Sequence, residues 1–112
     1  MSVHIFRVTV RGFFDDLTPE VRTALLDAAD KHEPLKAAFT EVGTFTYEPR
    51  LTAFSFRFQL REQGDDDPPA EVAARAEARA LDLASSYLAE SAIGHGNLRV
   101  QVTDMADMWN ED

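Results

Sequence analysis

Residues 51–60 alternate between apolar and polar side chains, and no other stretch restricts the fold of this chain as strongly. Successive side chains of a strand point to opposite faces of its sheet, so the pattern predicts a half-buried strand. Its apolar face carries Phe54, Phe56, Phe58 and Leu60. Its polar face carries Ser55, Arg57, Gln59 and, one residue further on, Arg61. The sequence therefore predicts a sheet with an aromatic core face and an arginine-bearing face.

Two further stretches, residues 3–11 and 97–103, show the same alternation and predict two more strands. Their polar faces carry Arg7, Thr9, Arg11, Arg99, Gln101 and Thr103. Residues 40–48, rich in threonine and aromatic residues, predict a fourth strand that a proline-containing turn joins to the central one. Pairing across that turn is expected to set Phe45 opposite Phe54, with the aromatic residues of both strands on one face.

Two helices are predicted between the strands. The first begins with Thr18 as its N-cap, and the second is an alanine-rich helix over residues 70–92. Phe13 and Phe14 precede the first helix, and we expect both to plug the core beneath it. The order strand, helix, strand, strand, helix, strand predicts an α+β fold of the ferredoxin-like βαββαβ type, a four-stranded antiparallel sheet with two helices on one face. Residues 1–112 are predicted to form a single domain, with 104–112 as a C-terminal tail.

The other face of this sheet is open and concentrates positive charge. Five of the chain's 11 lysine and arginine residues occupy the alternate strand positions that point to this face, whereas one acid, Glu48, is expected there. This gives the face a net charge of +4 and leaves −13 for the rest of a chain whose formal net charge is −9. Guanidinium groups suit bidentate contacts to carboxylates and phosphates, so this face is the candidate binding surface. The candidate ligand- or partner-binding residues are Arg7, Arg11, Arg57, Arg61, Arg99, Gln59 and Gln101.

The composition argues against several functional classes. The excess of acid disfavours binding to nucleic acid or to an anionic membrane by bulk electrostatics. RNA binding by stacked aromatic residues is also disfavoured. Turning Phe54 and Phe56 outward to stack on bases would bury the charged Arg57 in the core. The chain has no cysteine, and its three histidines lack partners at metal-ligand spacing, so neither a metal nor a cofactor is predicted. No catalytic signature appears, and the sequence leaves open whether the protein is an enzyme.

The start of the chain shows no secretion signal, and no apolar stretch approaches the roughly 20 residues that cross a bilayer. We therefore expect a cytoplasmic protein with no membrane partner.

Several short stretches resemble a family of small actinobacterial proteins that is catalogued as a domain of unknown function. They are residues 4–12, 38–40, 43–47, 94–95, 98–100 and 103–107. This resemblance covers nearly the whole chain but implies no activity, cofactor or catalytic residue. At the level of the fold, the chain is also similar to dimeric α+β barrel proteins, in which two such sheets face each other and enclose a pocket.

Two functions stay open at this point. The first is a non-catalytic homodimer or interaction module that uses the arginine-bearing face as its contact surface, since arginine stems cover apolar surface well. The second is an enzyme or binding protein of the dimeric α+β barrel type, which would hold a small anionic or phenolic metabolite with Arg7, Arg57 and Arg99.

Overall fold

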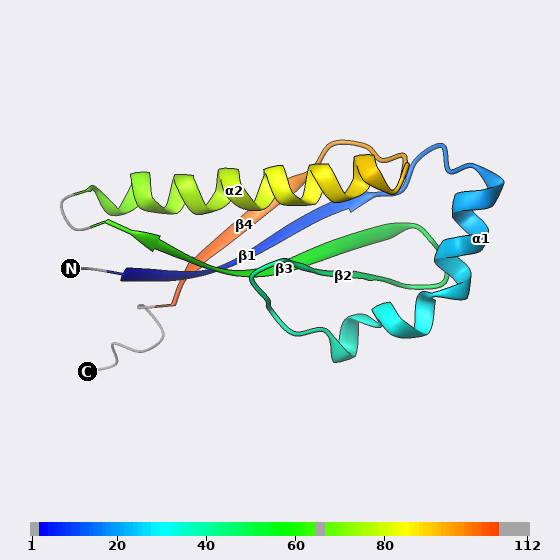
Figure 1. Ribbon diagram of the computed structural model, residues 1–112, viewed down its shortest axis with the longest axis horizontal. Helices are drawn as coiled ribbons and strands as arrows, with labels where there is room; N and C mark the ends of the chain where they lie inside the picture. The colour runs from blue at the N-terminus through cyan, green and yellow to red at the C-terminus, as the bar shows by residue number, and fades with distance from the viewer. Residues whose placement is uncertain (1–2, 65–66, 106–112) are drawn as a thin grey trace.

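The computed structural model describes residues 3–64 and 67–105, and every structural statement below concerns these residues. The elements, in chain order, are β1 (Val3–Phe13), α1 (Pro19–Asp27), η1 (Ala29–His32), η2 (Pro34–Lys36), β2 (Thr44–Tyr47), β3 (Ala53–Gln63), α2 (Pro69–Glu90) and β4 (Arg99–Asp104), where η denotes a 3-10 helix. The strands form one antiparallel sheet in the order β2-β3-β1-β4 (Figure 1). The prediction of an α+β fold with a four-stranded antiparallel sheet and two α-helices is confirmed.

The pairing of β1 with β3 defines the two faces of the sheet. The cross-strand pairs on the covered face, all buried, are Phe6–Leu60, Val8–Phe58 and Val10–Phe56. Each large apolar side chain that is fully buried stabilises the fold by about 1.5 to 3 kcal/mol. Arg7, Thr9 and Arg11 lie on the other face, opposite Gln59, Arg57 and Ser55. The two faces predicted from alternation are therefore those of the structure.

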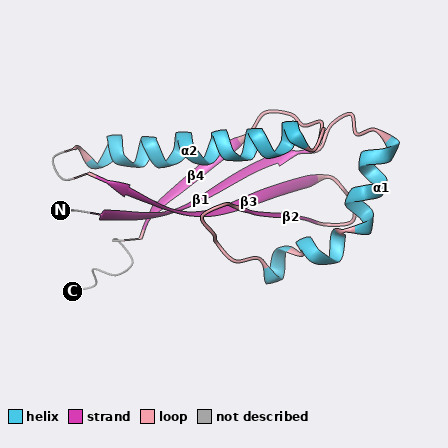
Figure 2. Ribbon diagram, viewed as in Figure 1, coloured by secondary structure: helices cyan, strands magenta, loops and turns pink. Residues whose placement is uncertain are grey.

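The long helix α2 lies along one side of the sheet, as Figure 2 shows. Its buried residues recur at four-residue spacing and are Val72, Ala76, Ala80, Ala84 and Leu88. The shorter helix α1 lies across one end of the sheet and reaches the core with Leu25 (Figure 1). At about 1.5 Å per residue, its nine residues are too few to follow the 11-residue strands. The sheet is thus covered mainly by α2, whereas α1 closes one end.

The register of β2 on β3 differs by two residues from the predicted one. Phe45 lies opposite Phe56 and Tyr47 opposite Phe54, because the connection between Tyr47 and its partner contains residues 48–53, whereas the predicted register requires only residues 48–51. Leu51 is buried at 6% exposure and adopts a positive φ of 54°. A shift of two residues preserves the parity of a strand, so the aromatic residues still face the core.

The two phenylalanines after the first predicted strand lie on opposite sides of the sheet. Phe14 packs in the core against Phe45, Tyr47 and Phe54, as expected. The expectation for Phe13 was wrong, because its side chain is 61% exposed. The reason is that β1 continues through Gly12 to Phe13, so that Phe13 shares the parity of Arg11.

Part of the predicted C-terminal tail belongs to the fold. Asp104 ends β4, and the buried Met105 donates its backbone N–H to the carbonyl oxygen of Ile5 at 2.8 Å. Residues 106–112 lie outside the described residues.

Tyr47 connects α1 to the sheet. Its hydroxyl donates a hydrogen bond to the carbonyl oxygen of Leu25 at 2.6 Å, and its ring stacks on that of His32 with centroids 5.2 Å apart. Burial, followed by the proximity of Tyr87 and Asp30, raises the pKa of Tyr47 above its ordinary value of 10.0. The native state therefore favours the neutral phenol, which is the form that donates this hydrogen bond.

We predict that Tyr47→Phe lowers the free energy of unfolding at neutral pH by about 0.5 to 1.5 kcal/mol, the net value of one hydrogen bond. Because the pKa is raised in the native state, the unfolded chain loses this proton first as the pH rises. The wild type should thus lose stability from about pH 10 upward, up to the native pKa. Urea unfolding across this pH range measures both effects. Tyr87→Phe keeps the hydrogen bond of Tyr47 and, since burial is the largest cause of the raised pKa, should keep an alkaline loss of reduced size. If Tyr47→Phe lost as much stability above about pH 10 as the wild type, the alkaline effect could not be assigned to Tyr47.

Candidate functional site

The segment between α1 and β2 crosses from the covered face of the sheet to the open face, which is the one opposite α2 (Figure 1). At its start, His32 lies on the covered side, where its Nδ1 is 2.8 Å from the carbonyl oxygen of Phe45. At its end, the N–H of Thr40 donates to the carbonyl oxygen of Arg57 on β3 at 3.2 Å. We call residues 33–40 the strap. The strap protects the edge of the sheet beside the short strand β2.

Arg57 fastens the strap to the open face. Its Nη1 donates hydrogen bonds to the carbonyl oxygens of Pro34 at 2.9 Å and Ala37 at 2.8 Å. The ring of Phe39 lies over the neighbouring Arg7, with 4.9 Å between the Cζ of Arg7 and the ring centroid, and the Cζ of Arg57 is 5.9 Å from the same centroid. These are cation–π contacts. The chain itself therefore occupies this part of the open face.

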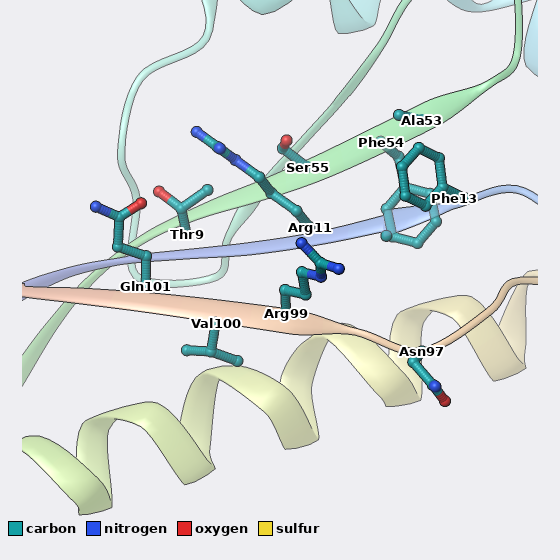
Figure 3. Close-up of a pocket in the computed structure, with 11 residues that line it drawn as sticks. Thr9, Arg11, Phe13, Ala53, Phe54, Ser55, Asn97, Arg99, Val100 and Gln101 are labelled. Carbon is teal, nitrogen blue, oxygen red and sulfur yellow. The ribbon is translucent and has the colours of Figure 1, made fainter.

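Beyond the strap, the open face contains a pocket of about 600 Å³ between β1, β3 and β4, which we call the arginine pocket (Figure 3). Residues that line it include Thr9, Arg11, Phe13, Ser55, Arg99 and Gln101. Arg11 and Arg99 are direct partners in the β1–β4 register, and Figure 3 shows both on the side of the sheet away from α2. Neither side chain makes a hydrogen bond or an ion pair with another described residue, and no described residue lining the pocket is acidic.

The seven residues predicted to bind a ligand or partner divide into three groups in the structure. Those at the strap are Arg7, Arg57 and Gln59, where Nε of Arg7 donates to Oε1 of Gln59 at 3.3 Å. Those lining the arginine pocket are Arg11, Arg99 and Gln101. Arg61 lies apart, exposed near the far end of β3 and opposite Ile5. The structure brings three of the seven together in one pocket, and their role in binding stays a prediction.

Two residues of this face were missed from the sequence. Phe13 had a usable signal, because continuing the alternation of β1 past Gly12 assigns it to the face of Arg11. Phe39 had none, because it lies on the strap, outside any helix or strand. Its position over Arg7 depends on contacts that the local pattern does not encode.

In residues 3–64 and 67–105, no group of three or more histidine, cysteine, aspartate or glutamate side chains is arranged to hold a metal ion. No helix in these ranges is both long and apolar enough to cross a membrane.

The fold and this face define a class of protein: a small α+β domain with a basic pocket on the uncovered face of its sheet. The chain belongs to a family of unknown function, DUF6204, whose model matches residues 1–111. No curated protein and no solved structure matches the chain.

We predict that Arg57→Gln loosens the strap. The variant loses the charged donor to Pro34 and Ala37, so its free energy of unfolding should fall by about 1.5 to 3 kcal/mol, the usual value of hydrogen bonds to a charged group. Trypsin should also cut faster at Lys36 in the strap. Urea unfolding and timed proteolysis measure the two effects.

Arg61→Gln is the matched control, because it removes the same charge from the same strand and face without touching the strap. Its stability should stay within about 0.5 kcal/mol of the wild type. Equal losses of stability in the two variants would show that Arg57 acts only through its charge.

Proposed function

We propose that this chain is a binding protein for a small anionic molecule, which it holds in the arginine pocket. The observation that carries this proposal is the direct pairing of Arg11 with Arg99 across β1 and β4. Like charges directly opposite each other destabilise a sheet, so the pair costs folding energy in the free protein. An anion between the two guanidinium groups would remove that cost and would gain charge-assisted, bidentate hydrogen bonds.

The remaining polar groups of the pocket favour binding over catalysis. Thr9 and Ser55 supply hydroxyls and Gln101 supplies an amide, whereas a guanidinium keeps its proton at any physiological pH. The described residues that line the pocket include no carboxylate, imidazole or lysine amine, the groups that usually act as general acids or bases near neutral pH. We therefore propose a binding function without a reaction.

We also infer the finer class of the fold. The strand order β2-β3-β1-β4, with α1 between β1 and β2 and α2 between β3 and β4, supports a single ferredoxin-like domain. The absence of cysteine supports a cytoplasmic location. The stretches that resemble the actinobacterial family support an actinobacterial origin.

We predict that acetate and inorganic phosphate bind this pocket saturably, as amide chemical shifts in an NMR titration would report. The double variant Arg11→Gln/Arg99→Gln should bind at least about 10-fold more weakly, since each charged hydrogen bond is worth about 1.5 to 3 kcal/mol. The control is Arg22→Gln/Arg61→Gln, which changes the net charge equally at exposed residues outside the pocket. The proposal fails if both double variants lose affinity equally or if the wild type shows no saturable shift.

A second candidate is a homodimer formed through the part of the open face that the strap leaves uncovered. The exposed ring of Phe13, beside a polar surface, favours it, because aromatic side chains with a polar rim are typical of interfaces. In a two-fold contact a surface meets itself, so arginines of one copy would approach those of the other. An anion held between the copies would offset this repulsion.

For this second candidate, light scattering at low salt, with and without phosphate, is the measurement. We predict a mass of twice the 12.5 kDa of one chain when phosphate is present, and a return to 12.5 kDa in Phe13→Glu. A mass of 12.5 kDa under every condition would rule the homodimer out.

A further inference from the structure

The arginine pocket has an apolar end as well as a charged centre. Phe13 follows Arg11 by two residues on the same face of β1 and is 61% exposed. Its direct partner on β3 is Ala53, a small residue that leaves one side of the ring unobstructed by a long side chain. At the other end, Thr9, which carries a hydroxyl, and Gln101, which carries an amide, are partners in the β1–β4 register. A ligand that fills the pocket would therefore meet an aromatic ring, two guanidinium groups and neutral polar groups in that order.

The size of the pocket argues against an inorganic anion as its proper ligand. About 600 Å³ is within the range of sites for small organic molecules, roughly 300 to 1,000 Å³. Phosphate or sulfate would fill a fraction of that volume between Arg11 and Arg99 and would leave Phe13 exposed. An organic anion with an apolar body would use both parts of the pocket.

The strap provides an internal precedent for the chemistry of such a ligand. On the same sheet face, it presents two carbonyl oxygens to the guanidinium of Arg57 and one aromatic ring, that of Phe39, to Arg7. Oxygen acceptors and a planar ring thus provide the hydrogen bonds and the cation–π contact for arginines on two neighbouring strands. In the arginine pocket the guanidinium groups again come from neighbouring strands, β1 and β4, but among the described residues neither has a side-chain hydrogen bond, an ion pair or a cation–π contact.

We propose that the arginine pocket takes a planar aromatic carboxylate. Its carboxylate is bound by Arg11 and Arg99, and its ring lies against Phe13. This inference rests on the proposed function, since it names the class of anion that the same pocket holds. It adds Phe13 as the residue that makes the pocket specific for an aromatic ligand, because stacked or edge-to-face rings attract each other beyond the apolar area that they bury.

Three probes separate the contributions: benzoate has the ring and the charge, acetate has the charge alone, and phenol has the ring without a carboxylate. NMR titration of the wild type should give the tightest binding for benzoate, at least about 3-fold tighter than for acetate, with phenol weakest. Phe13→Ala should weaken benzoate by about 3- to 10-fold and leave acetate unchanged. Because Phe13 is exposed and lies outside the core, the variant should leave the core undisturbed. Leu26→Ala, at a 46% exposed residue of α1 outside the pocket, is the control.

The outcomes distinguish this inference from the function on which it rests. Equal affinities for benzoate and acetate in the wild type would overturn the aromatic preference while leaving anion binding in place. The same holds if Phe13→Ala does not weaken benzoate. If neither anion binds the wild type saturably, both proposals fail. The comparison of benzoate with acetate needs no variant, so it stays decisive even if Phe13→Ala does not fold.

Discussion

The burial of aromatic and aliphatic side chains between the sheet and α2 is the constraint on which the rest of the structure depends. Val8, Phe58 and Leu60 are fully buried on this face, and their strand neighbours necessarily point the other way. A slip of one residue between β1 and β3 would turn the apolar side chains of one strand to the open face. It would also bury that strand's arginines without partners, which costs several kcal/mol per charge. The arginine-bearing face is therefore specified by the core, since a one-residue slip cannot keep the phenylalanines buried and the arginines hydrated at once.

Once that face exists, the strap divides it into two parts with different roles. Under the strap, Arg57 serves the fold, because its hydrogen bonds to Pro34 and Ala37 hold a segment in which no residue is fully buried. Beyond the strap, the side chains of Arg11 and Arg99 make no hydrogen bond or ion pair with another described residue. The same residue type on one sheet face is thus structural at one site and available for a ligand at another. Parity alone cannot distinguish the two cases.

The elements that could be predicted from the sequence are those with short-range patterns. Alternation assigned the faces of β1, β3 and β4, and Thr18 was recognised as the N-cap of α1, where it accepts a hydrogen bond from the N–H of Val21. The β2–β3 register was off by two residues, because the length of the turn depends on the burial of Leu51, which is a tertiary contact. The strap was missed for the same reason. Residues 33–40 show no periodic pattern of apolar residues, and they are held by hydrogen bonds from Arg57, some 20 positions away in the sequence. The candidate site was consequently predicted as a whole face, and only the structure shows which of its arginines contact the strap and which line the arginine pocket.

The electrostatics of the whole chain bear on how such a pocket selects its ligand. A net charge of −9 repels small anions at a distance, although salt screens that repulsion beyond a Debye length of about 8 Å under physiological conditions. Two guanidinium groups on an otherwise acidic protein therefore provide little long-range attraction, and the binding energy has to come from contacts made inside the pocket. In the binding that we propose, bidentate hydrogen bonds would provide part of it, and apolar contact with Phe13 would provide a part that the chain's net charge does not weaken. Under our proposal, an acidic protein with a small basic pocket would therefore favour organic anions, whose apolar body contributes to binding, over simple ions.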